Sequence, residues 1–134
     1  MEQKYIVGDL LKFILDDGEQ VVKVIGYDPT YERYLLTNEY IEQTRGCISV
    51  AEDRIKPIPL TPKILKKNGW KNDGYDWYKL PTKRAYLYIT KDITTLGEFL
   101  VCVGLDKHNL ASINFVHQLQ HLLFGLELNS EMEV

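Results

Sequence analysis

Three closely spaced prolines divide the chain, and they constrain its fold more than any other feature. Pro57, Pro59 and Pro62 lie in the segment Ile-Lys-Pro-Ile-Pro-Leu-Thr-Pro, residues 55–62. A proline holds the residue before it in an extended conformation, and a threonine followed by proline is a typical helix start. We therefore expect a junction here, between one unit at residues 1–58 and another at 59–134, as two units or as halves with a shared core.

The first unit has the pattern of short, paired β-strands. Residues 10–15 and 20–26 are rich in Val, Ile and Leu, and the sequence Asp-Asp-Gly-Glu between them favours a turn, which predicts a hairpin. Residues 34–36 and 47–50 are further short strands, joined by a polar connection that contains Gly46. The pattern predicts a small β-barrel-like unit, similar to barrels of the Src-homology-3 or Tudor kind.

The second unit has the pattern of a helix, three strands and another helix. A helix starting at Pro62 should stop at Gly69, where Leu65 and Trp70 occupy positions whose side chains meet. Residues 75–80, 84–91 and 99–105 are the strands, and a final helix is expected at 114–126 with Asn114 as its cap. The predicted class is α+β, with a three-stranded antiparallel sheet and a C-terminal helix after the barrel-like unit.

The composition is that of a soluble globular protein. Of the 134 residues, 45% are hydrophobic and 26% charged, and the net charge is -3. No apolar run is long enough to cross a bilayer, so we expect a cytoplasmic protein with no membrane partner. Cys47 and Cys102 form no C-x-x-C pair, which predicts reduced, buried thiols. Charge is uneven, because residues 59–92 hold eight Lys/Arg and three Asp/Glu.

Two histidines four residues apart lie on the final predicted helix. On a helical wheel, His117 and His121 fall opposite the apolar stripe that contains Leu119 and Leu123, so they should point away from the sheet. The spacing resembles that of the H-E-x-x-H zinc helix, but Gln118 replaces the glutamate that would act as base. The pair is a solvated or hydrogen-bonded pair, a metal ligand, or part of a partner interface, and an outward-facing Phe124 favours the interface.

A basic and aromatic segment, residues 63–91, is the second candidate site. Lysines interleaved with aromatic rings can bind single-stranded nucleic acid, because the cations follow phosphates and the rings stack on bases. Packing alone also explains Tyr in strands and Lys on an exposed helix. The residues that would carry such binding are Lys66, Lys71, Trp77, Arg84, Tyr86 and Tyr88.

Motifs of common enzymes are missing from the sequence. There is no G-x-G-x-x-G, Walker A or G-x-S-x-G pattern, so we predict no catalytic residue and no cofactor. The block Pro-Ile-Pro-Leu-Thr-Pro-x-Ile-Leu-x-x-x-Gly-Trp, residues 57–70, and the closing Val-His-Gln-Leu-Gln-His-Leu, residues 116–122, resemble small prophage or mobile-element proteins of gut anaerobes. That group has no established activity, and the resemblance implies a cytoplasmic accessory protein that acts by binding.

Three functions remain open at this stage. The leading hypothesis is a non-enzymatic protein-interaction module whose partner face includes His117, His121 and Phe124. The alternative is single-stranded nucleic-acid binding through residues 63–91. The third is a metal-dependent hydrolase that uses His117 and His121 as ligands.

Overall fold

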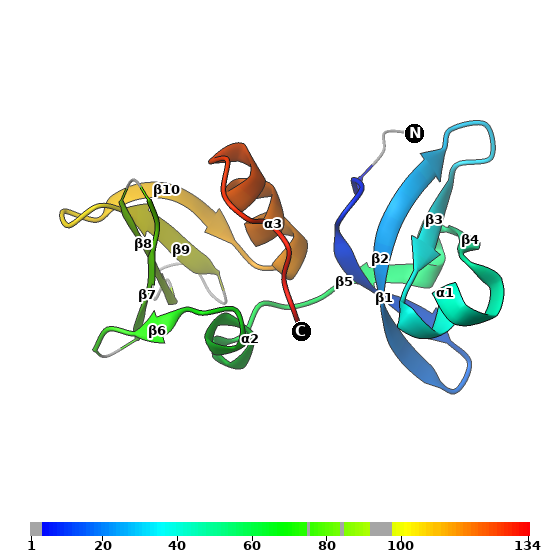
Figure 1. Ribbon diagram of the computed structural model, residues 1–134, viewed down its shortest axis with the longest axis horizontal. Coiled ribbons are helices and arrows are strands. Elements are labelled where there is room, and N and C mark those ends of the chain that lie inside the picture. Colours follow the sequence, from blue (N-terminus) through cyan, green and yellow to red (C-terminus); the bar gives the residue numbers. More distant parts are fainter. Residues whose placement is uncertain (1–3, 75, 84, 92–97) are drawn as a thin grey trace. The chain divides into compact units, whose positions relative to one another are not determined.

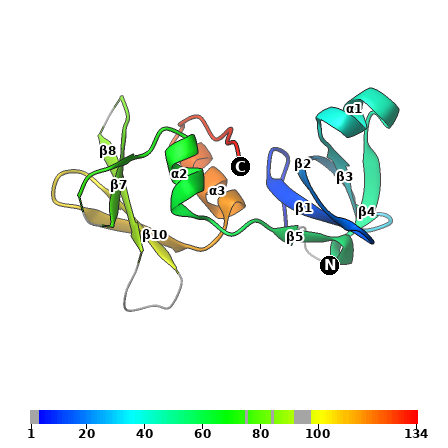
Figure 2. The same ribbon diagram turned by 90° about the horizontal axis from the view of Figure 1, so that it is seen from below.

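The computed structural model describes residues 4–74, 76–83, 85–91 and 98–134. It is an α+β protein in which strands predominate, and its strands form two antiparallel sheets. The chain divides into two compact units, Met1–Ile58 and Pro59–Val134 (Figures 1 and 2). Each unit has a five-stranded sheet of its own.

The first unit is built from consecutive antiparallel pairs, with strand order β4-β3-β2-β1-β5. The predicted hairpin is present, and Leu15 pairs with Gly18 across a two-residue turn. The elements of this unit are β1 (Leu10–Leu15), β2 (Gly18–Asp28), β3 (Arg33–Thr37), α1 (Glu39–Arg45), β4 (Ile48–Ala51), the 3₁₀ turn η1 (Glu52–Arg54) and β5 (Ile55–Pro57).

The prediction of a barrel-like first unit is wrong. In the described part of the chain β4 pairs with β3 and β5 pairs with β1, so the sheet stays open with β4 and β5 as its edges. The polar connection before Gly46 contains a helix, α1, which the sequence pattern does not predict. The side chain of Asn38 caps α1 by accepting from the N–H of Ile41 at 2.8 Å.

The core of the first unit comes from one face of this sheet and from the segment before it. Along β2, Val22 and Val24 are buried while Val21 and Ile25 are exposed, which is the period-two pattern of a strand covered on one face. The buried cluster is made up of Tyr5, Leu11, Val22, Val24, Tyr34, Leu36, Ile41, Val50 and Ile55.

The second unit also has a five-stranded sheet, in the order β10-β9-β8-β7-β6, together with two helices. Its elements are α2 (Pro62–Lys67), β6 (Lys71–Asn72), β7 (Trp77–Pro81), β8 (Tyr86–Lys91), β9 (Phe99–Val103), β10 (His108–Ile113) and α3 (Val116–Gly125).

The predicted three-stranded sheet is therefore too small. The two added strands are the edges, β6 and β10. β6 has two residues, and β10 contains His108, Asn109 and Ser112, all exposed. Neither has the apolar alternation of a half-buried strand. Each is held by main-chain pairing to one neighbour, and such pairing needs no apolar pattern in the sequence.

The start and stop signals of α2 act as predicted. Thr61 Oγ1 accepts from the N–H of Ile64 at 3.2 Å, and Pro62 is the first helical residue. After the helix, Gly69 has a φ of 89°, and the N–H of Trp70 donates to Leu65 O at 3.1 Å. Leu65 and Trp70 are both buried.

The second sheet has an inner face and an outer face. Leu87 and Ile89 of β8 and Val101 of β9 are buried, as the alternation of β8 predicts. Helices α2 and α3 lie on the same side of this sheet (Figures 1 and 2). These aliphatic side chains therefore belong to the helix-covered inner face, and the alternate residues of the same strands form the outer face.

Candidate binding face of the second sheet

Strand register gathers aromatic and basic side chains on the outer face. Lys79 of β7 pairs with Tyr88 of β8, Pro81 pairs with Tyr86, and Trp77 pairs with Thr90. Residues that are paired across antiparallel strands project from the same face. Trp77, Lys79, Tyr86 and Tyr88 therefore share the face opposite Leu87 and Ile89.

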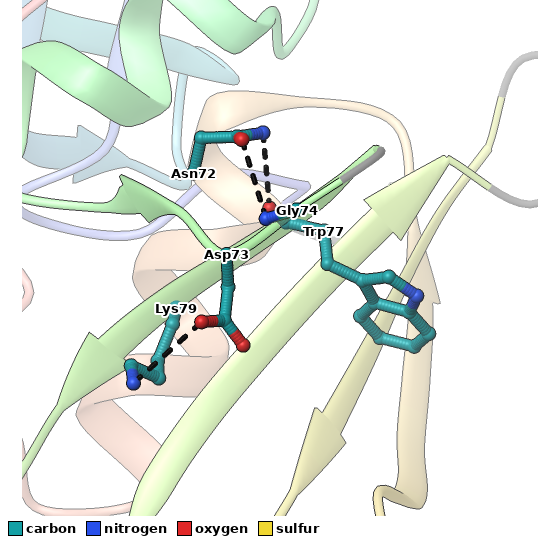
Figure 3. A network of polar contacts seen from close by, with 5 residues as sticks. All are labelled: Asn72, Asp73, Gly74, Trp77 and Lys79. Carbon is teal, nitrogen blue, oxygen red and sulfur yellow. Dashed lines mark hydrogen bonds and ion pairs between the residues drawn. The ribbon is translucent and has the colours of Figure 1, made fainter.

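The hairpin between β6 and β7 fixes one end of this face. Asn72 Nδ2 donates to the main-chain oxygen of Trp77 at 3.3 Å, and Asn72 Oδ1 accepts from the N–H of Gly74 at 3.3 Å (Figure 3). Lys79 Nζ lies 3.7 Å from Asp73 Oδ1. The indole of Trp77 points away from Asn72 and Asp73 (Figure 3). The polar network thus binds main-chain atoms of the hairpin, and the Trp77 ring takes no part in it.

Two lysines lie over the rings. Lys79 Nζ is 4.8 Å from the ring centre of Tyr86. Lys107 Nζ is 4.7 Å from the ring centre of Tyr88 and 5.2 Å from that of Trp77. The rings themselves are neighbours, since Trp77 and Tyr88 are 6.3 Å apart in an edge-on arrangement and Tyr86 and Tyr88 are 6.5 Å apart. These distances are those of cation–π and aromatic pairs.

A tight turn between β9 and β10 positions Lys107. Gly104 has a φ of 80° and Lys107 a φ of 52°, and the N–H of Lys107 donates to Gly104 O at 3.0 Å. A Cβ atom on Gly104 would lie 3.1 Å from Asp106 Oδ1, so glycine suits both the dihedral angle and the space. In the same turn His108 Nε2 lies 2.7 Å from Asp106 Oδ2.

Cys102 of β9 is the buried neighbour of Tyr88 on this face. It pairs with Tyr88 across the strands, it is buried, and its Sγ lies 3.3 Å from Asn109 Oδ1. Burial raises the pKa of the Cys102 thiol, and the nearby Lys107 offsets part of that rise. The thiol is therefore neutral at physiological pH and acts as a packing group, as predicted for this cysteine. Cys47, predicted to be buried, is exposed.

The structure brings together part of the predicted nucleic-acid set. Trp77, Tyr86 and Tyr88 are neighbours, and Lys71 lies opposite Lys79 in the register of β6 and β7. Lys66 belongs to α2, on the helix-covered side of the sheet. Arg84 lies outside the described residues. Lys107 was missed, because only the turn after β9 brings it above the rings.

We call the resulting surface the aromatic-lysine face. Tyr86 is 42% exposed, Trp77 is partly exposed, and Tyr88 is buried beneath Lys107. Two rings, those of Trp77 and Tyr86, are thus at least partly accessible for stacking, and a lysine ammonium group lies over each of them. The face comprises Lys71, Trp77, Lys79, Tyr86, Tyr88 and Lys107.

The histidines of α3 do not both face away from the core. His117 is only 8% exposed, so its predicted outward orientation is wrong, whereas His121 is half-buried and Phe124 is 69% exposed. The His117 ring stacks on Phe115, with 5.9 Å between ring centres, and meets His121 edge-on at 5.5 Å. Aromatic packing therefore accounts for the position of His117.

The buried side of α3 is wider than the predicted apolar stripe, and the start of the helix also differs from the prediction. Gln120 is buried and its Nε2 donates to Ser130 O at 3.2 Å, so residues after the helix cover this side. The helix begins at Val116 with Phe115 as its N-cap, and Gln118 Oε1 accepts from the N–H groups of Asn114 and Phe115. The prediction that Asn114 caps this helix is therefore wrong.

A metal centre finds no further support in the described part of the chain. No group of three or more His, Cys, Asp or Glu side chains there has an arrangement that could hold a metal ion. His117 and His121 would need at least a third protein ligand to form a catalytic zinc site.

Comparisons with known proteins give no independent guide to function. The chain matches no protein-family description, no curated protein and no solved structure. Among the described residues, no helix has the length and apolar content needed to span a membrane. The geometry of the chain's own residues therefore carries the functional argument.

Proposed function

We propose that the second unit binds single-stranded nucleic acid through the aromatic-lysine face, in a cytoplasmic accessory protein without catalytic activity. The observation that carries this proposal is the gathering of three rings and three lysines on a sheet face that is not the core face. Bases stack on aromatic rings at about 1–3 kcal/mol each, and lysines follow the phosphates.

The arrangement favours a single strand over a duplex. A sheet face with at least partly exposed rings presents stacking surfaces, and only unpaired bases can leave their own stack to use them. Trp77 and Tyr86 would each accept one base, because these two rings are at least partly exposed whereas Tyr88 is buried. The ammonium groups of Lys79 and Lys107 can move from the rings to a phosphate group by rotation of the flexible lysine side chains.

Fluorescence anisotropy of a labelled single-stranded oligonucleotide tests this proposal. Binding should weaken with added salt with a log–log slope of about -2, the value for roughly three neutralised phosphates. Lys79→Ala and Lys107→Ala should each make the slope shallower. Lys23→Ala is the matched control, because Lys23 is an exposed strand lysine of the first unit.

Two outcomes would reject binding to this face, and a third would reject the stacking of free bases. One is the absence of binding to single strands of either DNA or RNA at low salt. The other is binding that Lys79→Ala, Lys107→Ala and Lys23→Ala weaken to the same extent, which would indicate unspecific attraction to lysines anywhere on the chain. Equal affinity for a duplex of the same length would also contradict stacking of free bases.

A second candidate function is protein interaction through α3. It is supported by Phe124, a large apolar side chain that is 69% exposed and lies three residues from the half-buried His121. His117 would support this face from beneath, through its ring contact with His121. Phe124→Ala and His121→Ala should leave the fold intact and remove a partner that co-purifies from the native host; an unchanged set of co-purified proteins would reject this candidate.

A further inference from the structure

The segment after α3 returns along this helix and reaches the end of α2 (Figure 1). Asn68, just after α2, contacts both main-chain groups of Glu133. Its Nδ2 donates to Glu133 O at 2.7 Å, and its Oδ1 accepts from the N–H of Glu133 at 2.7 Å. Lys67 Nζ donates to the main-chain oxygen of Val134 at 2.9 Å. The end of α2 thus recognises a peptide main chain much as a neighbouring strand would.

A buried side chain of α3 holds the same segment at a second point. Gln120 is 5% exposed, and its Nε2 donates to Ser130 O at 3.2 Å. A buried amide needs a hydrogen-bond partner, so this contact is selective for a carbonyl at that place. All these hydrogen bonds, from Asn68, Lys67 and Gln120, are to main-chain atoms. Another peptide that followed the same path could make them too.

The segment lines a cleft that retains free volume. The cleft measures about 750 Å³, within the usual range for ligand sites. Its apolar lining includes Trp70, Leu80 and Leu123, and the segment adds Leu128 and Met132. Lys83 lies in the lining contributed by the turn after β7, whereas Glu127 and Glu131 are contributed by the segment. Main-chain contacts and an apolar cleft are the two parts of a peptide-binding site.

Charge selects the kind of peptide. Residues 127–134 contain Glu127, Glu131 and Glu133 and no Lys or Arg. Helix α2 contains three exposed lysines and no acidic residue. Glu131 and Glu133 are exposed, and they alternate with Met132 and Val134, which are partly buried. An acidic segment of this kind complements the lysines of α2 and Lys83 of the cleft lining.

We propose that the end of α2 and the adjacent cleft form a docking site for an acidic peptide of another protein, with alternating acidic and apolar residues. Residues 130–134, Ser-Glu-Met-Glu-Val, occupy this site in cis and must leave before the partner binds. The proposal is independent of nucleic-acid binding, because the site lies at α2 and α3 rather than on the aromatic-lysine face.

Residues 130–134 compete with a free peptide for the site, and their attachment to the chain determines how strongly they compete. A segment joined to its site by a short link has an effective concentration in the millimolar range. A free peptide with a dissociation constant of about 0.1 mM would therefore appear at least about tenfold weaker on the intact chain than on a chain that ends at Asn129. Ending the chain at Asn129 keeps the hydrogen bonds of Glu127 and Leu128 to α3.

The test measures the anisotropy of a labelled peptide with the sequence of residues 128–134. We expect binding to the chain that ends at Asn129, binding at least about tenfold weaker to the intact chain, and loss of binding when Asn68→Ala is added to the shortened chain. A matched peptide with lysine in place of both glutamates should bind at least about tenfold more weakly than the acidic one. Equal binding of the two peptides would overturn the proposal, as would equal binding to both chain lengths.

A displacement experiment on the intact chain covers the case in which the shortened chain fails to fold. The acidic peptide, added at millimolar concentration, should release residues 130–134, and their amide NMR signals should become narrow and move towards random-coil positions. Signals of residues 130–134 that stay unchanged up to this concentration would show that the segment is a fixed part of the fold, and would overturn the proposal.

Discussion

Two aromatic clusters of this protein are built from similar residues and do different things. In the first unit the ring of Tyr34 is 4.8 Å from that of Tyr27 and 5.5 Å from that of Tyr5, and its hydroxyl accepts from the N–H groups of Lys4 and Tyr5 at 2.7 and 3.2 Å. In the second unit the rings of Trp77 and Tyr86 remain accessible and lysines lie over them. The first cluster stabilises a fold, and the second presents a surface.

The polar ends of the rings explain this difference. Burial is the main cause that raises the pKa values of Tyr5 and Tyr27 above the usual range for tyrosine, with a smaller contribution from nearby carboxylates. Lys4 Nζ also lies 5.8 Å from the Tyr5 ring centre, but that ring is fully buried. The hydroxyl of Tyr34 and its buried ring are thus used inside the first unit, whereas the rings of Trp77 and Tyr86 keep accessible surface for a ligand.

The largest effect is expected from breaking the first cluster. Tyr34→Ala should lower the free energy of unfolding by about 3–5 kcal/mol, because it empties a buried aromatic site. Tyr34→Phe should lower it by about 1–3 kcal/mol, since two N–H groups lose their acceptor. Urea denaturation followed by circular dichroism measures both variants. A loss below about 1 kcal/mol for Tyr34→Ala would contradict a structural role for this cluster.

A smaller effect on stability and a clear effect on binding are expected from the second cluster. Tyr86→Ala should change the free energy of unfolding by less than about 1 kcal/mol, because this ring is 42% exposed. It should weaken oligonucleotide binding about 5- to 150-fold, the equivalent of about 1–3 kcal/mol for one stacked base. Tyr40→Ala on α1 is the control, an exposed tyrosine of the first unit that should leave binding unchanged. A large loss of stability with unchanged oligonucleotide binding in Tyr86→Ala would instead give this cluster a structural role.

The smallest expected effect is on stability, from two lysines of the first unit that pair with a carboxylate instead of lying over rings. Lys12 and Lys56 of the first unit both approach Glu19, at 3.5 Å for Lys12, and the hydrogen bond from Lys56 lowers the pKa of that carboxyl. A lowered pKa means that this stabilisation is present above the ordinary pKa of glutamate and disappears as the pH falls through the lowered value. Glu19→Gln removes it.

Thermal unfolding of wild type and Glu19→Gln from neutral to acidic pH measures this effect. The wild type should be slightly more stable at neutral pH, and the difference should vanish on acidification. A difference that stays constant with pH would mean that the ion pairs of Glu19 do not contribute.

Local signals in the sequence predicted the elements that depend on them. The cap at Thr61, the helix stop at Gly69 and the alternation around Leu87 and Ile89 all appear as expected. Elements that depend on a partner were missed. β10 is an edge strand of mostly exposed residues held by β9, and α1 has one buried residue, Ile41, so neither has a periodic apolar pattern.

The candidate site was predicted in part for the same reason. Trp77, Tyr86 and Tyr88 lie close together in sequence on strands whose pairing a hairpin defines. Lys107 comes from a different strand pair, and its position depends on the turn at Gly104. A helical wheel predicts an outward His117 because it takes no account of the residue before the helix, Phe115, on which the His117 ring stacks.

Tryptophan fluorescence tests the central claim most directly, because the chain has two tryptophans in opposite situations. Trp70 is buried and Trp77 lies on the aromatic-lysine face. A base stacked on Trp77 should quench its emission as a single-stranded oligonucleotide is added, and Trp77→Phe should still bind by anisotropy while showing no quenching. Binding without quenching in the wild type, or equal quenching in Trp77→Phe, would contradict recognition by this face.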